Sequence, residues 1–309
     1  TRHYPPTNPG VDRAFGTFTN ATQMINHIIK TGTPAQKILA QRIKPFMRGV
    51  KVVVVDSLTP FTARYDEEIG YENLDQDGYA NLDQEGANLM LKAMSNPDVA
   101  GVYFENVIYL DNQNQGGWGL DSMTALHEAF HAAVNAKIRM YLENPESVSP
   151  ALREAIEQLE GLFMAFQDHI SEDATTASGL SDVIASAELD AMRPTLKELF
   201  ALGDDGPAGD LSEFITYSLT NETLQRYLSI LPTPLSYKFK NKYYSPTKNN
   251  WLAEIYDIFR KMFNVGNGTQ EATLLEDLLL VVDVILDTTD IPPPPQAVRP
   301  SYAKKVAQT

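Results

Sequence analysis

The sequence predicts an α+β protein that is mostly helical, with a small N-terminal sheet and a helical C-terminal part. Two runs of β-branched and aromatic residues, 51–57 (KVVVVDS) and 101–111 (GVYFENVIYLD), are typical of strands. From Pro150 to residue 289, apolar residues recur at helical spacing in several segments. With 309 residues, 43% of them hydrophobic, the chain can form one large domain or two modest ones around a sizeable core.

The first part of the chain is expected to place two helices before the first strand. Residues 1–18 are polar and rich in Pro and Gly, which indicates a loosely held arm. Apolar spacing predicts a helix at 21–30, and a second one within 33–47, where Pro34 stands near the helix start. The acidic, Gly- and Asn-rich stretch 66–88 predicts a loop or an insertion in the small sheet.

A helix that carries paired histidines is expected after the second strand, within residues 120–142 (LDSMTALHEAFHAAVNAKIRMYL), with Asp121 as its N-cap. It contains the pattern His-Glu-x-x-His at His127, Glu128 and His131. Two histidines four residues apart lie on one helical face, so both imidazoles can reach one ion. The glutamate between them then lies beside the ion, where it can take a proton from a water that zinc activates.

The residues around the motif favour a buried site over an exposed, idle histidine pair. They are small or apolar: Leu126, Ala129, Phe130, Ala132, Ala133 and Val134. The chain has five histidines, so a chance match to the pattern is improbable. It has no cysteine, so a Zn²⁺ cofactor would have to be held by histidine and carboxylate.

The third metal ligand has several candidates, because zinc in hydrolases takes three protein ligands and a water. A histidine six residues beyond His131 is absent, since that position is Lys137. The candidates farther along the chain are one histidine and several acidic residues: His169, Glu172, Glu188 and Glu213, with Asp168 and Asp173 as further options.

The C-terminal part is predicted to consist of amphipathic helices, followed by a tail. The helices are expected at 150–170, 181–202, 210–231, 245–265 and 269–289, with a loop at 203–210. Asp210 is the expected cap of the third, and Glu213 then stands in the capping-box position, a role that competes with metal binding. The Pro-rich residues 291–309 predict an extended linker.

Residues 211–228, LSEFITYSLTNETLQRYL, resemble a segment of a known family. The pattern Glu-Phe-x-x-x-x-(Leu/Phe)-(Ser/Thr)-Asn-x-x-x-Gln follows the metal motif in zincin-like metallopeptidase domains of large polyvalent proteins from phages and mobile elements. In the zincins with a glutamate third ligand, the gluzincin type, a downstream helix supplies that glutamate. The resemblance therefore implies Glu213 as the third ligand, and the other matching positions are Phe214, Thr220, Asn221 and Gln225.

The resemblance extends over roughly residues 100–290, because the segment from Trp251 to Asp287 is similar to the region that closes those domains. It implies a zincin-like domain at 19–290, with the sheet in about 19–145 and helices in about 146–290. Two features depart from the family: the acidic stretch 66–88 has no counterpart, and no Met-turn is visible.

The resemblance implies a zinc metalloprotease that hydrolyses a peptide or protein substrate, with Glu128 as the general base. Tyr217, one turn beyond Glu213, is either a donor to the developing oxyanion or a core tyrosine. The edge of the strand at 101–111 would bind an extended peptide by strand addition. Two other functions stay open: a structural or packing module that retains the fold, and hydrolysis of a non-peptide amide such as cell-wall material.

Charge and hydropathy limit the partners. A net charge of −15 argues against nucleic-acid and anionic-membrane binding, which need a basic face. The longest apolar run, LLLVVDVIL, is broken by Asp283 and is too short to span a membrane. The chain starts without a Met or a signal peptide and ends in the Pro-rich tract. We therefore expect a piece of a larger parent polyprotein, acting in a virion or in a host cytoplasm.

Overall fold

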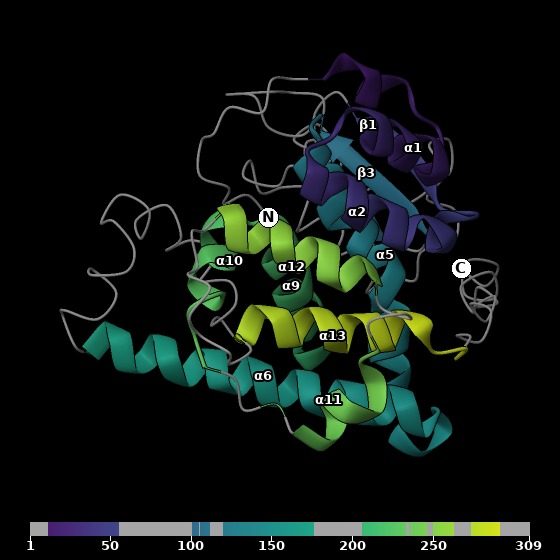
Figure 1. Cartoon of the computed structure of the whole chain (residues 1–309). Coiled ribbons are helices and arrows are strands. Elements are labelled where there is room, and N and C mark those ends of the chain that lie inside the picture. The colour runs from purple at the N-terminus through teal and green to yellow at the C-terminus, as the bar shows by residue number, and fades with distance from the viewer. Residues whose placement is uncertain are drawn as a thin grey trace, which may run out of the picture.

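The computed structural model describes most of the helical part and a small sheet. The described residues are 12–55, 101–104, 106–111, 120–175, 206–232, 235, 237–245, 250–262 and 273–290. The predicted acidic insertion 66–88, the helix at 181–202 and the linker 291–309 lie outside these ranges. The described fold is mostly helical with one three-stranded sheet, which confirms the predicted α+β class (Figure 1).

The helices occupy most of the segments where the sequence predicts them. The α-helices are α1 (Ala21–Thr31), α2 (Pro34–Ile43), α5 (Ser122–Glu143), α6 (Pro150–Thr175), α9 (Gly206–Thr220), α10 (Glu222–Leu228), α11 (Tyr237–Tyr243), α12 (Asn250–Met262) and α13 (Leu274–Asp287). In the described part of the chain, three short 3₁₀-helices accompany them: η1 (Arg13–Thr17), η2 (Lys44–Met47) and η5 (Pro145–Ser147). Among the described helices, none is both long and apolar enough to cross a membrane.

The sheet consists of β1 (Lys51–Val55), β2 (Gly101–Phe104) and β3 (Val107–Asp111) in the order β1-β3-β2. The central strand β3 is parallel to β1 and antiparallel to β2. The prediction of one strand at 101–111 is therefore wrong, because the chain reverses within it. Asn106 has φ +66°, a left-handed conformation that Asn tolerates better than most residues, and this permits the tight turn.

The predicted N-terminal arm 1–18 is wrong for its second half. Asp12 caps η1 by accepting a hydrogen bond from the backbone N–H of Ala14, and its carboxylate lies 2.5 Å from His27 Nε2 on α1. The backbone N–H of Asp12 also donates to the carbonyl of Leu120, and Phe15 is fully buried in the core. The polar composition of residues 1–18 therefore gives no indication that Phe15 is a core residue that fixes this segment.

The helix at 210–231 is also two helices rather than one. Asn221 ends α9 and begins α10, since its side chain accepts a hydrogen bond from the backbone N–H of Leu224. At its other end α9 starts at Gly206, inside the predicted loop 203–210, so the prediction of Asp210 as N-cap is wrong. Pro207 stands in its first turn, where a missing N–H costs nothing.

The most buried helix is α13, which runs through the middle of the helical part (Figure 1). Its acidic side chains are paired with neighbouring helices. Asp283 accepts hydrogen bonds from Arg42 of α2 and Trp251 of α12, and Asp277 lies 2.8 Å from Lys240 of α11. These pairs make burial of the charges tolerable and connect three helices to α13.

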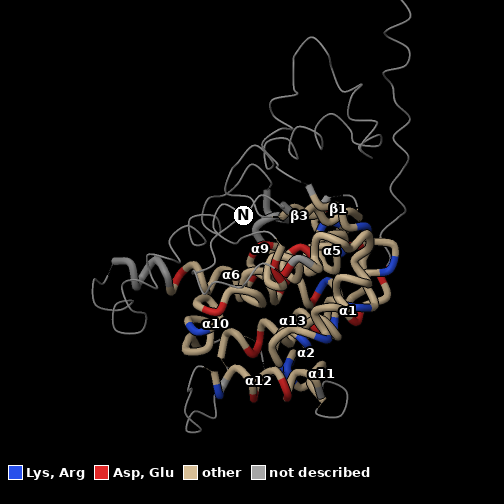
Figure 2. The backbone as a smooth tube through the Cα atoms, turned by 90° about the horizontal axis from the view of Figure 1, so that it is seen from above, with Lys and Arg blue, Asp and Glu red and all other residues tan. Residues whose placement is uncertain are grey.

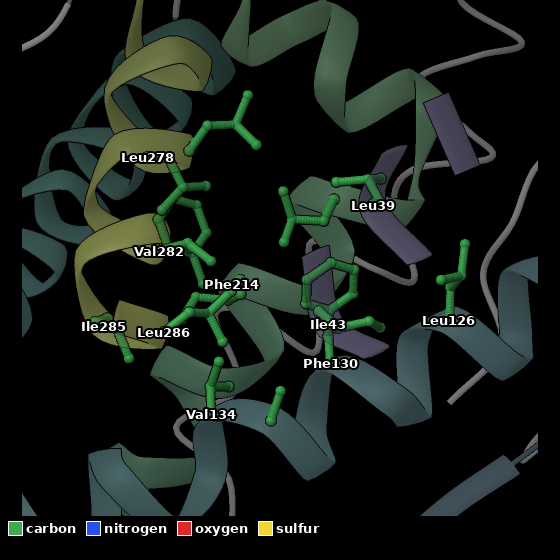
Figure 3. Close-up of a cluster of buried hydrophobic side chains, with 14 of the residues drawn as sticks. Leu39, Ile43, Leu126, Phe130, Val134, Phe214, Leu278, Val282, Ile285 and Leu286 are labelled. Atoms are coloured by element: carbon green, nitrogen blue, oxygen red, sulfur yellow. The ribbon is translucent and has the colours of Figure 1, made fainter. Parts of the chain in front are cut away.

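The hydrophobic core lies between α2, α5, α9 and α13 (Figure 3). From α5 it receives Leu126, Phe130 and Val134, which are four residues apart and so share one face of the helix. Two of these core residues directly precede the histidines of the motif. Burial of this face therefore sets the rotation of α5 and turns the adjacent histidine face toward α9.

Candidate metal centre

The helix α5 holds His127 and His131 on one face, one turn apart. Its N-terminus is capped as predicted, because the Asp121 side chain accepts hydrogen bonds from the backbone N–H groups of Met123 (2.7 Å) and Thr124 (2.9 Å). Both imidazoles are buried, with side-chain exposed fractions of 3% and 9%. Their Nε2 atoms are 3.1 Å apart and point into the same space.

The helix α9 brings Glu213 to this pair from more than eighty residues away in sequence. Glu213 Oε1 lies 3.2 Å from His131 Nε2, and its Oε2 lies 3.3 Å from His127 Nε2. About a third of the Glu213 side chain is exposed, although its Oε2 atom is buried. Among the described residues, these three form the group whose ligand atoms all lie within 4.8 Å of one another.

The capping-box interpretation of Glu213 is wrong. Because α9 begins at Gly206, Glu213 stands in the middle of the helix, where the backbone N–H groups are already bonded within it. Its carboxylate faces the two histidines instead. The position of Glu213 within α9 therefore excludes helix capping and is compatible with metal binding.

The distances fit a tetrahedral ion. Two ligand atoms that are each about 2.0–2.1 Å from a tetrahedral zinc lie about 3.3 Å apart. The two Nε2 atoms here are 3.1 Å apart, and each lies 3.2 or 3.3 Å from a different oxygen of Glu213. In addition, Glu213 Oε2 is buried, and among the described residues it makes no hydrogen bond of good geometry, although His127 Nε2 lies 3.3 Å away. A buried carboxylate oxygen in this position costs free energy unless a cation is bound beside it.

The electrostatics of the group also favour a cation. Burial lowers the pKa of His127, and Glu213 only partly opposes this. Burial would lower the pKa of His131 too, but the charge of Glu213 and its hydrogen bond, together with the charge of Glu128 and a hydrogen bond to Asn135, outweigh burial and raise the pKa. Burial alone would raise the pKa of Glu213, but attraction to the two imidazoles holds it well below its usual value. A carboxylate that stays charged and two imidazoles therefore share one small space that a metal ion can neutralise.

The rival ligands do not join this group where their side chains are described. His169 is half-buried and Asp168 is exposed on α6, and neither belongs to the cluster. The side chains of Glu172 and Asp173, and the whole of Glu188, lie outside the described residues.

Lys137, at the position where a third histidine is absent, faces away from the group. Its ammonium donates hydrogen bonds to the carbonyls of Ile285 (2.7 Å), Leu286 (3.1 Å) and Thr288 (2.9 Å), at the C-terminal end of α13. A cation suits that end of a helix, where carbonyl groups lack partners. The residue therefore belongs to the contact between α5 and α13.

Glu128 is buried beside the metal group but is not a member of it. It lies against the edge strand β2. A Cβ atom on Gly101 would come within 2.9 Å of Glu128 Cγ and 3.1 Å of its Oε1. The absence of a side chain at Gly101 thus leaves the space that the Glu128 carboxylate occupies.

Tyr217 packs on the imidazole of His127, with ring centroids 4.7 Å apart in an edge-to-face arrangement. The residue is fully buried. Of the two roles considered for it, this position supports that of a core tyrosine that holds His127 in place.

Sequence reasoning missed several polar residues that surround the imidazoles. They are Asn135 on α5 and three hydroxyl residues that recur every four positions on α9: Ser212, Thr216 and Thr220. That spacing places the three hydroxyls along one face of α9. The repeat next to Glu213 is the signal that could have identified them.

Comparison with known proteins found no match, either among family models, among curated proteins or among solved structures. The chemistry of the site therefore has to be argued from its residues.

Replacement of Glu213 tests the ligand set. We expect Glu213→Gln to weaken zinc binding at least about 100-fold, because a neutral amide replaces the only carboxylate of the group. His169→Gln is the matched control and should leave the affinity unchanged, as measured by competition with a chromophoric chelator. If His169→Gln weakened zinc binding and Glu213→Gln did not, His169 would be the third ligand instead of Glu213.

Zinc affinity should fall as the pH is lowered. The metal must displace the proton of His131, whose pKa is raised, so the loss begins above the ordinary histidine range near 6.5. Each displaced proton weakens the apparent affinity about tenfold per pH unit below the pKa. Calorimetric titrations in buffers of different ionisation enthalpy measure this proton release. A zinc affinity that is constant between about pH 8 and pH 5 would contradict a histidine site.

Proposed function

We propose that this chain is a zinc-dependent metallopeptidase domain of the zincin type. The observation that carries the proposal is the arrangement of four residues: His127, His131 and Glu213 converge on one point, and Glu128 lies beside them without joining the ligand group. A purely structural zinc site usually closes its fourth position with protein and has no use for a base. Here no fourth histidine or carboxylate of the described residues joins the group, and about a third of the Glu213 side chain is exposed.

The three residues suit zinc in number and in atom type, and His127, His131 and Glu213, whose ligand atoms all lie within 4.8 Å of one another, would hold it. Bound zinc would act as a Lewis acid that polarises a carbonyl group and makes an adjacent water more acidic. Glu128 then accepts the proton of the attacking water and returns it to the leaving amine. Burial of Glu128 beside Gly101 keeps its carboxylate in one place for both transfers.

The strand that would bind the substrate is β2 rather than the whole of 101–111. The segment that leads toward the motif helix is β3, which is paired on both sides and offers no edge. β2 is an outer strand among the described residues, and its first residue, Gly101, touches Glu128. An extended peptide added to β2 would therefore run past the base, held by backbone hydrogen bonds with little sequence choice.

The wider assignment rests on the resemblance of residues 100–290 to the metallopeptidase-like domains of phage and mobile-element polyvalent proteins. In that setting the partners are a peptide or protein substrate and the rest of a parent polyprotein. Nucleic acid is a poor partner, since the net charge is −15 and the basic residues of the described elements are spread over several helices (Figure 2).

Replacement of the base tests the peptidase. We expect Glu128→Gln to lower the hydrolysis of a pool of fluorogenic peptides by at least about 100-fold, because general-base catalysis is lost. Zinc content should be unchanged, as measured by atomic absorption. Cleavage that survives this change would contradict the proposed base. A wild-type protein that binds zinc but cleaves no peptide would support the structural module instead.

Gly101 provides an independent test of where the base lies. The Cβ of Gly101→Ala would push Glu128 out of position, since it would approach Cγ to 2.9 Å. We expect kcat to fall about 10- to 100-fold, because a displaced catalytic group loses its alignment. Zinc affinity should be unchanged. Gly161→Ala on α6, where an added Cβ meets nothing within 4 Å, is the control and should retain full activity.

A further inference from the structure

Two side chains of α5 pack against the outer strand β2 at a single residue. A Cβ atom added to Gly101 would lie 2.9 Å from Glu128 Cγ and 3.0 Å from Thr124 Cγ2. Thr124 stands four residues before Glu128, so the two side chains are neighbours on one face of the helix. Both residues are buried. The strand therefore packs on α5 at two points, the methyl group of Thr124 and the side chain of the proposed base.

A hydrogen bond fixes the rotamer of Thr124. A threonine in a helix divides between two χ1 rotamers, which place its methyl group differently. The hydroxyl of Thr124 donates to Asp121 Oδ2 at 2.8 Å, while Asp121 Oδ1 accepts from the backbone N–H groups of Met123 and Thr124. The Asp121 carboxylate is buried and is itself held in place by the helix N-terminus that it caps. The hydrogen bond thus selects the rotamer whose methyl group lies against Gly101.

The methyl group of Thr124 lies where it can determine how closely β2 approaches the base. The position of the added Cβ at Gly101 is also 3.1 Å from Glu128 Oε1, so the strand, the methyl group and the carboxylate occupy adjoining space. Loss of one methyl group from such a close-packed contact lets its neighbours shift into the vacated volume. A displacement of about 1 Å can lower the rate of a catalysed reaction about 100-fold. The alignment between a peptide added to β2 and the Glu128 carboxylate therefore depends on this contact.

We propose that Thr124 is a positioning residue, whose methyl group sets the spacing between β2 and the carboxylate of Glu128. Asp121 supports it by fixing the rotamer, in addition to capping the helix. The catalytic consequence rests on the proposed function, because it concerns a peptide bound along β2. The spacing is a property of the fold and does not depend on that function.

Removal of the methyl group alone tests the positioning role. Thr124→Ser keeps the hydroxyl group that bonds to Asp121, whereas Thr124→Val keeps a methyl group in the place of Cγ2 and removes the hydroxyl. Per bound zinc, kcat for fluorogenic peptides should fall about 10-fold in Thr124→Ser and stay within about twofold of wild type in Thr124→Val. KM and zinc affinity should be unchanged in both. Thr223→Ser, at a buried threonine of α10, is the matched control and should retain full activity.

These two variants separate spacing from helix capping. A role limited to the cap would depend on the hydroxyl group, so Thr124→Val would be the impaired variant and Thr124→Ser would be as active as wild type. That result would overturn the proposal. Equal losses of kcat in the two variants would overturn it as well, because the methyl group that Thr124→Val retains would then have no effect.

A double-mutant cycle in unfolding tests the contact without reference to activity. In urea unfolding of the metal-free protein, Gly101→Ala should lower the midpoint, because the added Cβ has two close neighbours. The same substitution should lower the midpoint less in the Thr124→Ser background, where one of these neighbours is gone. Equal shifts in both backgrounds would overturn the spacing. If wild-type protein cleaves no peptide, the proposed function fails and the catalytic role of Thr124 fails with it, while the cycle still decides whether its methyl group sets the spacing of β2.

Discussion

The packing of α5 against α9 decides whether three distant side chains meet at one point. Each candidate ligand has a core residue as its neighbour in sequence: Leu126 precedes His127, Phe130 precedes His131, and Phe214 follows Glu213. A shift of one residue along either helix would rotate its side chains by about 100° and expose the core face. Burial of each large apolar side chain contributes about 1.5–3 kcal/mol, so the core strongly opposes such a rotation. The site is consequently held by the hydrophobic contacts behind it.

That rigidity keeps three ionisable side chains close together. The Nε2 atoms of His127 and His131 lie 3.1 Å apart, and each has an oxygen of Glu213 at 3.2 or 3.3 Å, so a shared cation would neutralise the carboxylate charge. Hydroxyl groups of α9 lie against the two imidazoles, and Gly101 of β2 leaves space for Glu128. The same helix pair thus brings the candidate ligands together, with the proposed base Glu128 beside them.

Sequence reasoning recovered the parts of this site that local spacing determines. The motif helix, its Asp121 cap and the shared face of the histidines follow from helical geometry alone. Glu213 could not be decided locally, because a carboxylate near an expected helix start suits a cap as well as a metal. The start of α9 at Gly206 removes the capping role, and the ligand role of Glu213 is what we propose. The sequence does not distinguish Ser212, because hydroxyl residues are common in helices and their hydrogen-bond partners depend on tertiary packing.

The errors in the fold have two different origins. The turn at Asn106 falls between two apolar runs, at the polar pair Glu105–Asn106, and the positive φ of Asn106 divides the segment into two strands. The buried Phe15 stands in a polar segment, and its ring packs edge-to-face on Phe18 and on His27 of α1, with centroids 5.7 and 5.3 Å apart. Leu120, far along the chain, also holds this segment, because its carbonyl accepts a hydrogen bond from the backbone N–H of Asp12.

X-ray absorption at the zinc edge of the loaded protein measures the coordination itself. A stoichiometric ion with two imidazole nitrogens and two oxygen ligands at about 2.0–2.1 Å, one oxygen from Glu213 and one from water, is the predicted result. The oxygen contribution from protein should disappear in Glu213→Gln, while the imidazole signal remains. A zinc ion without imidazole ligands, or a protein that takes up no zinc in stoichiometric amount, would contradict the account.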